Sequence, residues 1–231
     1  MPLIFKTDGN HNIFFTINYA FTLSMYLMWL WCWFVTILGD PGRVSDDLKN
    51  RGLLKRIQQG DIPYCLRHIP ICMKCQLPKP PGCTHCNICG SCHLREDHHC
   101  GVTGQCIADK NFKAFILSFM YAGIMGLSCT PCSIYYYFYV DRMNVWSLIL
   151  LIYSLIMGLM IMGFGVSFCS GSVDEIAAID KIHGRSKTVA LSRLWSTFGE
   201  NWWNRIIPVQ KNSTELAWPG VNWEDEDNIL L

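Results

Sequence analysis

Residues 72–106 read CMKCQLPKPPGCTHCNICGSCHLREDHHCGVTGQC and hold eight of the 13 cysteines of this 231-residue chain. Four histidines, His85, His93, His98 and His99, lie in the same stretch. Mixed Cys/His clusters are typical of zinc sites, whereas a disulfide framework needs no histidine. Because zinc–thiolate sites suit a reducing compartment, we expect this segment to face the cytosol.

The spacing of these residues predicts two structural Zn²⁺ ions. Pairs spaced C-x2-C offer two thiolates to one tetrahedral zinc, and a closed structural site needs four ligands. Adjacent residues such as His85 and Cys86 point in different directions, so they feed different metals and the two sites interleave. The expected ligands are Cys72, Cys75, His85 and Cys92 at one site, and Cys86, Cys89, His99 and Cys106 at the other.

Two other interpretations of the cysteines are weaker. Scattered reduced cysteines would not show the repeated C-x2-C spacing. A RING-type module would need a closing C-x2-C pair, whereas five residues separate Cys100 from Cys106. Cys83 and His93 remain without a role in this scheme, and we expect them at the surface or supporting the ligands.

Cys100 is left over when both sites are full, which makes it a candidate nucleophile. In an extended segment, side chains two positions apart point the same way, so His98 can meet Cys100 while His99 points toward metal. A nearby imidazole can take the proton of a thiol, and the thiolate is the reactive form. The alternative, that Asp97, His98 and Cys100 are further zinc ligands, conflicts with the ligand count.

Three uncharged runs flank or follow this region, at 13–38, 114–139 and 145–169. Each exceeds the roughly 20 residues that span a bilayer, and only a helix satisfies the backbone there. The first run is too long for a signal peptide and has no cleavage site after it; Pro131 should kink the second. We predict an all-α integral membrane protein with three transmembrane helices and a zinc-bound domain of short hairpins and loops.

The basic residues predict the orientation. Segment 39–113 carries 11 Lys/Arg and the tail after residue 170 carries six, whereas the other side carries only Lys6 and Arg142. The positive-inside rule therefore places 39–113 and the tail 170–231 in the cytosol, and 1–12 and the turn 140–144 in the lumen. The Asn212 glycosylation sequon should then stay empty.

Apolar residues on the cytosolic flanks have helical spacing. Leu48, Leu53, Leu54 and Ile57 alternate with basic residues, as in a helix lying on the membrane surface. The tail shows the same kind of pattern at Leu191, Leu194, Trp195 and Phe198, which indicates interfacial helices. A net charge of +1 gives no reason to expect a nucleic-acid partner, and uncharged membrane runs disfavour a transporter.

The position of Cys100 suggests the substrates. Only about a dozen residues separate it from the second apolar run, so its thiol should sit at the cytosolic membrane surface. An acyl-CoA could there put its chain among the helices and its polar head in water. Cys100 would take the acyl group and pass it to a juxtamembrane cysteine of another protein, with His98 moving the protons.

These residues resemble the DHHC protein acyltransferase family. The zinc spacings match it from Cys72 to Phe115, as do 97-Asp-His-His-Cys-100, Cys106 and Asn111, and Asp40-Pro41-Gly42 matches a second family motif. The resemblance implies two-step transfer from palmitoyl-CoA, the same metal assignment, activation of Cys100 by Asp97 and His98, and an endomembrane (Golgi or ER) or plasma-membrane location.

The sequence departs from the family pattern at several places. Gly101-Val-Thr-Gly-Gln105 replaces Pro-Trp and an Asn, Gly82 replaces an arginine, and Leu194 replaces an Asn. Ser172-Val-Asp-Glu175 replaces Thr-Thr-x-Glu and has the form of a capping box with Ser172 as N-cap. The chain shows three apolar helices where most members have four. A catalytically silent, zinc-stabilised membrane scaffold is therefore the alternative function.

No residue is assigned to the CoA phosphates. Lys110, Lys113, Arg185 and Lys187 are the candidate cations, and they fit solvated positive flanks equally well.

Overall fold

The computed structural model describes residues 9–140, 144–182, 192, 195, 198, 199, 201–209 and 217–223. Its helices are α1 (Gly9–Leu38), α2 (Val44–Asn50), α3 (Leu54–Gln58), α4 (Phe112–Tyr135), α5 (Val145–Ile182) and α7 (Trp202–Ile206), with a 3₁₀ turn η1 (Tyr64–Leu66) and a π-helical turn η2 (Tyr136–Val140). Its strands are β1 (Thr84–Cys86), β2 (Ser91–His93), β3 (His98–Cys100) and β4 (Gln105–Ile107).

The chain divides into two compact units. Unit 1 comprises Met1–Cys32 and Ile116–Phe168, and unit 2 comprises Trp33–Phe115 and Cys169–Leu231. Three helical stretches among the described residues are long and apolar enough to cross a membrane: Ile13–Leu38, Phe112–Val140 and Val145–Ala178. The predicted three apolar helices are thus present, and the second begins two residues earlier than expected.

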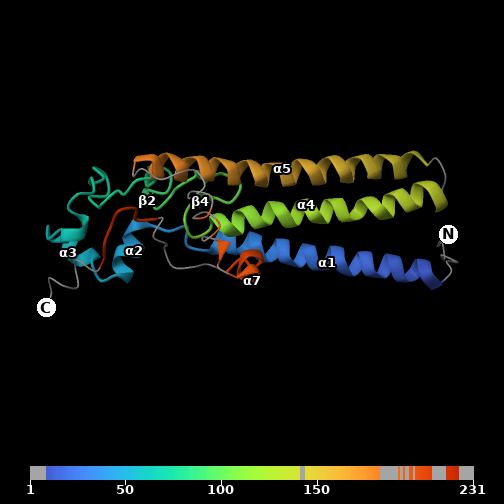
Figure 1. Ribbon diagram of the computed structural model, residues 1–231, viewed down its shortest axis with the longest axis horizontal. Coiled ribbons are helices and arrows are strands. Elements are labelled where there is room, and N and C mark those ends of the chain that lie inside the picture. The colour runs from blue at the N-terminus through green and yellow to red at the C-terminus, as the bar shows by residue number, and fades with distance from the viewer. Residues whose placement is uncertain are drawn as a thin grey trace. The chain divides into compact units, whose positions relative to one another are not determined.

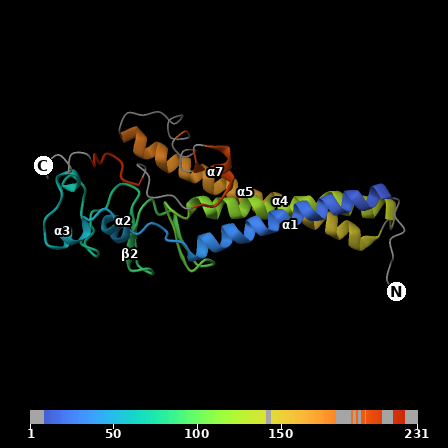
Figure 2. The same ribbon diagram turned by 90° about the horizontal axis from the view of Figure 1, so that it is seen from below.

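In unit 1, α1, α4 and α5 run side by side (Figures 1 and 2). Helices in lipid approach closely where their residues are small. Gly126 of α4 faces Gly158 of α5, and a Cβ at Gly158 would lie 2.8 Å from the Leu127 side chain. Glycine is therefore required at Gly158 by the contact between α4 and α5.

Polar side chains join α1 to α4 within the same unit. The Asn18 amide donates to the Ser128 carbonyl at 2.9 Å, and the Thr22 and Ser128 hydroxyls lie 2.8 Å apart. Cys32 of α1 also packs with Leu117 and Tyr121 of α4 in a small hydrophobic cluster. Hydrogen bonds of this kind hold helices together where lipid offers no hydrophobic driving force between them.

The third apolar helix continues without a break past residue 169 to Ile182. Ser172 is buried inside this helix, with 3% of its surface exposed. It therefore does not act as the N-cap of a new helix, and the capping-box interpretation of residues 172–175 is wrong. A capping sequence specifies a helix start only if the preceding residues leave the helical conformation, and they do not do so here.

Unit 2 contains two antiparallel hairpins, β1–β2 and β3–β4. His85 pairs with Cys92 in the first, and His99 pairs with Cys106 in the second. Helix α2 packs against β2 (Figure 2). The short hairpins and loops expected of the cysteine-rich segment are therefore observed.

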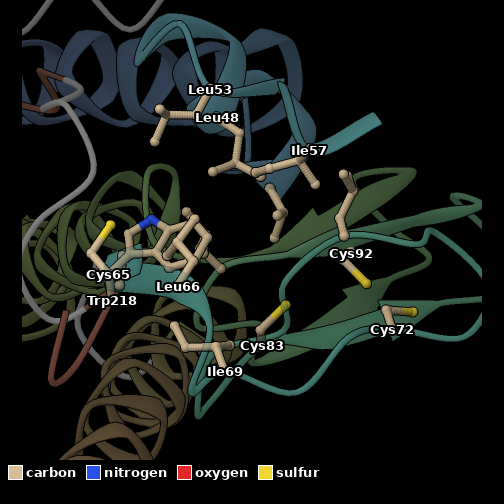
Figure 3. Close-up of a cluster of buried hydrophobic side chains, with 14 residues drawn as sticks. Leu48, Leu53, Ile57, Cys65, Leu66, Ile69, Cys72, Cys83, Cys92 and Trp218 are labelled. Atoms are coloured by element: carbon tan, nitrogen blue, oxygen red, sulfur yellow. The ribbon is translucent and has the colours of Figure 1, made fainter. Parts of the chain in front are cut away.

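A hydrophobic core lies beside the hairpins and is built by α2, α3, η1 and a segment of the tail (Figure 3). Leu48, Leu53 and Ile57 point into it and are at most 9% exposed. Burial in a protein core excludes contact with lipid, so the interpretation of this stretch as a membrane-surface helix is wrong. The helical spacing was correct, but the partner of its apolar face is protein.

Trp218 supplies the largest side chain of this core and lies beside Cys65 and Leu66 (Figure 3). Its indole nitrogen donates to the Asp47 carboxylate at 2.8 Å, and Asp47 also pairs with Arg51 at 2.9 Å. The Arg51 guanidinium stacks over the Trp223 ring at 3.9 Å. A short tail segment thus closes the core, which no local sequence pattern indicated.

In the remaining tail, Trp195 and Phe198 are described, whereas Leu191, Leu194 and Asn212 lie outside the described residues. Phe198 is buried and Trp195 is half exposed. Trp202 and Trp203 of α7 are stacked and mostly exposed. Membrane contact by this part of the tail stays a prediction.

Candidate metal centres and reactive cysteine

The first candidate metal cluster gathers Cys72, Cys75, His85 and Cys92. The three sulfurs lie 3.1–3.8 Å from His85 Nδ1. Tetrahedral zinc, with Zn–S of about 2.3 Å and Zn–N of about 2.05 Å, needs N···S separations of about 3.6 Å. These residues therefore fit one tetrahedral metal ion.

The second cluster gathers Cys86, Cys89, His99 and Cys106. Its sulfurs lie 3.4–3.6 Å from His99 Nδ1, and the Cys89 and Cys106 sulfurs are 3.5 Å apart. These separations also suit tetrahedral zinc. Both clusters could hold metal ions, and they are the two sets that ligand counting predicted.

The hairpins explain the interleaving. His85 and Cys86 are neighbours on β1 and point to opposite sides, so they join different clusters. In each hairpin, two ligands of the same cluster face each other across the strands: His85 pairs with Cys92, and His99 pairs with Cys106. The N–H groups of Cys75 and Lys74 outweigh burial and lower the pKa of Cys72 to about 7, which favours the ligating thiolate.

Cys83 and His93 are both buried, so of the two expected places, at the surface or supporting the ligands, the surface is wrong for both. Burial raises the pKa of the Cys83 thiol to about 12, which keeps it neutral within the hydrophobic core. Burial likewise lowers the pKa of His93 to about 4, helped by the nearby Arg43 charge. Both residues are enclosed parts of unit 2.

Cys100 belongs to neither candidate cluster. It ends β3 and is partly exposed, which leaves its thiol accessible. Burial would raise its pKa, but hydrogen bonds from Thr103, His98 and Val102 outweigh it and hold the pKa of Cys100 below 9.0. A lowered pKa increases the fraction of nucleophilic thiolate near neutral pH.

His98 lies between Asp97 and Cys100. Its Nδ1 is 2.7 Å from the Asp97 carboxylate, and its ring packs edge-on against Phe115 with centroids 5.5 Å apart. Burial disfavours the charged imidazole, but the contacts with Asp97 and Cys100 outweigh it and raise the pKa of His98. The structure thus brings together the three candidate catalytic residues in an order suited to moving a proton.

The turn that follows Cys100 has its own hydrogen bonds. The Thr103 hydroxyl lies 3.3 Å from the carbonyls of both Cys100 and Gln105 and can donate to either. Sequence reasoning treated residues 101–105 only as a departure from a family pattern. Their role as supports of Cys100 could have been suspected from the hairpin geometry, because Gln105 is the direct partner of Cys100 in the β3–β4 ladder.

Gln105 also connects this hairpin to the end of α1. Its amide donates to the carbonyls of Thr36, Ile37 and Gly39, while the Asn111 amide reaches Thr36 and Cys106. The last carbonyls of a helix have no partner within the helix. Gln105 therefore satisfies the end of α1 and fixes the strand opposite Cys100 to it.

The motif Asp40-Pro41-Gly42 contacts the same region. Asp40 accepts from the Gly42 N–H at 2.9 Å and from Lys110 at 2.7 Å, and these contacts outweigh burial to lower the pKa of Asp40. Lys113, 7% exposed, donates to the Asn204 carbonyl. Lys110 and Lys113 therefore have internal partners, and they are not simply solvated flanks; Arg185 and Lys187 lie outside the described residues.

Unit 1 contains a largely apolar cavity of about 660 Å³. Phe15 and Tyr19 of α1, Gly126 of α4, and Leu150 and Met157 of α5 are among its lining residues. This size is within the range of cavities that take small molecules. No residue of the Asp97–His98–Cys100 group lines it.

Residues 68–179 match the family model described as DHHC palmitoyltransferase. The chain is 32% identical over 124 residues to "Probable protein S-acyltransferase 13" of Arabidopsis thaliana, covering 48% of this chain and 41% of that protein. It is 29% identical over 133 residues to "Palmitoyltransferase ZDHHC2" of Homo sapiens, covering 49% and 36%. It is 42% identical over 67 residues to "Palmitoyltransferase ZDHHC15" of Xenopus laevis, covering 29% and 20%.

The alignments span 41%, 36% and 20% of these three relatives' own lengths, less than half in each case. The family-model match includes the cysteine-rich region, which is the part of the chain that carries both candidate metal clusters and Cys100.

Proposed function

We propose that this chain, whose residues 68–179 match the DHHC palmitoyltransferase family model, is a membrane-bound protein S-acyltransferase. It moves a fatty acyl group, palmitoyl foremost, from acyl-CoA to Cys100 and then to a cysteine of another protein. The observation that carries this proposal is a partly exposed Cys100, outside both metal clusters and beside a histidine–carboxylate pair.

In the first half-reaction, the Cys100 thiolate attacks the thioester carbonyl of acyl-CoA. The bond between the acyl carbon and the CoA sulfur breaks, and protonated His98 supplies the proton to the departing CoA thiolate. Asp97 orients the imidazole and stabilises its charged form, as supported by the 2.7 Å contact and the raised pKa of His98. The product is an acyl thioester on Cys100.

In the second half-reaction, a substrate protein's cysteine takes the place of CoA. His98 accepts the proton of that thiol, the new thiolate attacks the acyl carbon, and Cys100 leaves as a thiolate. A thiolate with a lowered pKa is a better leaving group, so the hydrogen bonds to Cys100 assist this step also. The overall exchange of one thioester for another needs no external energy source.

Two zinc ions would hold the scaffold for this chemistry. The donor separations in both clusters suit tetrahedral zinc. Bound zinc would fold the hairpins by joining residues distant in sequence, and would thereby set the β3 strand that bears His98 and Cys100. The metals have no role in the acyl-transfer steps.

The three apolar helices would anchor the domain in a membrane, with unit 2 on the cytosolic side as the basic residues predict. The acyl donor and its lipid chain fit such a location. The Golgi, ER and plasma membranes each offer this arrangement. The protein substrates would be those with cysteines close to the bilayer.

The experiment that tests the function is covalent labelling. Purified protein in detergent is incubated with a clickable palmitoyl-CoA analogue, and the label is challenged with hydroxylamine, which cleaves thioesters. We expect a hydroxylamine-sensitive label on the wild type and none on Cys100→Ser, with unchanged metal content in both. A folded, metal-loaded wild type that takes no label would identify a catalytically silent scaffold instead.

A further inference from the structure

His93 and Glu96 carry the buried side-chain atoms that lack a hydrogen-bond partner among the described residues, namely His93 Nδ1 and Glu96 Oε2. Such atoms are rare in folded proteins, and an ion or an ordered water is the usual explanation. His93 is fully buried, with 0% of its surface exposed. Its other ring nitrogen lies 3.4 Å from the Ser91 hydroxyl, so Nδ1 is the atom without a partner.

Both unpartnered atoms belong to one cluster. Ligand atoms of His93, Glu96 and Cys106 all lie within 4.8 Å of one another, and Glu96 Oε1 is 3.1 Å from the Cys106 sulfur. His93 ends β2, Cys106 lies in β4, and Glu96 lies in the segment that connects β2 to β3. The two hairpins therefore bring a nitrogen, an oxygen and a sulfur ligand to one buried place.

Charge gives an independent reason for a cation here. Cys106 is a thiolate when the second metal cluster is loaded, and it then lies beside the Glu96 carboxylate in a poorly hydrated place. One divalent ion against three thiolates leaves the loaded second cluster with one excess negative charge, and the half-buried Glu96 carboxylate beside it is costly unless a further positive charge compensates both. The nearby cations are already committed, because Arg95 pairs with Asp109 at 2.9 Å and Lys110 pairs with Asp40 at 2.7 Å.

We propose that His93 Nδ1, the Glu96 carboxylate and the Cys106 sulfur bind a third metal ion. The Cys106 thiolate then bridges this ion to the metal held by Cys86, Cys89 and His99. Imidazole, carboxylate and thiolate together are ligands that Zn²⁺ accepts, and a water completes four-coordination. This site depends on metal in the second cluster but not on acyl transfer.

A third ion would fix the segment between the hairpins. Asp97 follows Glu96 directly, and its N–H donates to the Ile107 carbonyl beside Cys106 at 2.9 Å. A metal ion bound by both Glu96 and Cys106 would hold the segment between β2 and β3 a second time, through its side chains. The position of the Asp97 carboxylate beside His98 would thus be set partly by the third ion.

The first test is metal content. The full chain is purified in detergent, dialysed against trace zinc, and its metal is measured by inductively coupled plasma mass spectrometry. We expect three zinc ions per chain in the wild type, two in Glu96→Gln and His93→Leu, and three in the control His68→Gln, which alters an exposed histidine. Two ions in the wild type, or three retained in both variants, would overturn the proposal.

A second measurement tests the bridging thiolate directly and needs only the wild type. Two Co²⁺ ions joined by a thiolate couple magnetically, so the cobalt-substituted protein should show less electron paramagnetic resonance intensity than its cobalt content requires. The isosteric variant Glu96→Gln should recover an intensity proportional to its cobalt. Full intensity in the wild type would exclude a Cys106-bridged pair, even if a variant failed to fold.

Discussion

At the scale of single residues, His98 has contacts that suit a base and Cys100 has contacts that suit a nucleophile. The Asp97 carboxylate lies 2.7 Å from Nδ1 of the His98 imidazole, and Phe115 packs against the ring. His99, the next residue, points into a metal cluster. Strand alternation thus points His98 toward Asp97 and its neighbour His99 toward the metal cluster.

His98→Ala should slow auto-acylation of Cys100 by about a hundredfold or more, the usual range for loss of a general acid–base group. Metal content should stay the same, because His98 belongs to neither metal cluster. The rate is measured with fluorescent or clickable palmitoyl-CoA, and metal by mass spectrometry. A normal rate in this variant would remove His98 from the mechanism.

Alkylation of Cys100 should depend on pH with a midpoint below 9.0, because the hydrogen bonds from Thr103 and His98 lower the pKa of the thiol. A thiol with a lowered pKa is more ionised at any pH below 9.0, so iodoacetamide should modify it faster at pH 7 than an ordinary cysteine. His98→Ala should move the midpoint upward. Mass spectrometry of the Cys100 peptide gives the rates, and buried Cys83 should stay unmodified.

At residue scale, both candidate metal clusters could be predicted from the sequence, whereas the catalytic roles of Asp97, His98 and Cys100 stay predictions. Ligand spacing is encoded locally, so counting C-x2-C pairs and histidines identified both clusters and the spare Cys100. The contributions of Glu96, Thr103 and Gln105 were not predicted, because each depends on which residues a hairpin places opposite one another. Register of that kind follows from three-dimensional pairing, not from spacing alone.

At the scale of elements, the ends of helices and their contacts position the candidate site. Gln105 caps the carbonyls of α1 and is the ladder partner of Cys100. The strand pair and the helix end are thereby joined by one side chain.

Gln105→Ala should slow auto-acylation several-fold and lower the melting temperature while leaving the metal content unchanged. The variant removes a donor from the partly buried carbonyls of Ile37 and Gly39, whereas Asn111 still donates to Thr36. Loss of such a hydrogen bond costs roughly 1–3 kcal/mol of stability. Gln58→Ala, at an exposed position of α3, is the matched control. Equal rates and melting temperatures in the two variants would show that the cap is dispensable.

Gly158→Val should destabilise unit 1, whereas Gly163→Val should not. Both residues lie in α5, but a Cβ at Gly158 would be 2.8 Å from Leu127 Cγ and 2.9 Å from the Leu127 backbone nitrogen, and a Cβ at Gly163 would meet nothing within 4 Å. Overpacking of this kind costs roughly 1–3 kcal/mol. Thermal unfolding in one detergent compares the variants, and equal melting temperatures would contradict the observed α4–α5 contact.

The helices themselves were predictable because long apolar runs have few alternatives, and the first described span agrees with the expected 13–38. The end of the third helix was not, since nothing between Cys169 and Ile182 is incompatible with a helix. The short helices α2 and α3 were recognised by their apolar spacing and given the wrong partner. Amphipathic spacing specifies a buried face but not whether lipid or protein covers it.

At the scale of the whole molecule, unit 2 combines the segment between the first and second apolar helices with the tail that follows the third. Its core joins Leu48 and Ile57, from before the cysteine-rich stretch, to Trp218 in the tail (Figure 3). The tail segment thus completes a core that the residues around the hairpins share with α2 and α3.

Trp218→Ala should therefore destabilise unit 2 by about 3–5 kcal/mol, the usual cost of removing a large buried aromatic side chain. The variant also leaves Asp47 without its indole donor. Trp203→Ala, at an exposed position, should have a small effect. Chelator-induced zinc release and limited proteolysis report the difference, and equal release rates would show that the tail segment is not part of the stable core.

The place of Trp218 in that core has a consequence for biogenesis. Trp218 is translated after both metal clusters and after helices α4 and α5. The hydrophobic core beside the hairpins is therefore incomplete until the tail has been translated. Until Trp218 packs into the core, the reduced cysteines are exposed to oxidation and to binding by chaperones. Timely zinc delivery during membrane insertion would protect them, and truncated nascent chains should be recognised by quality control as unfinished.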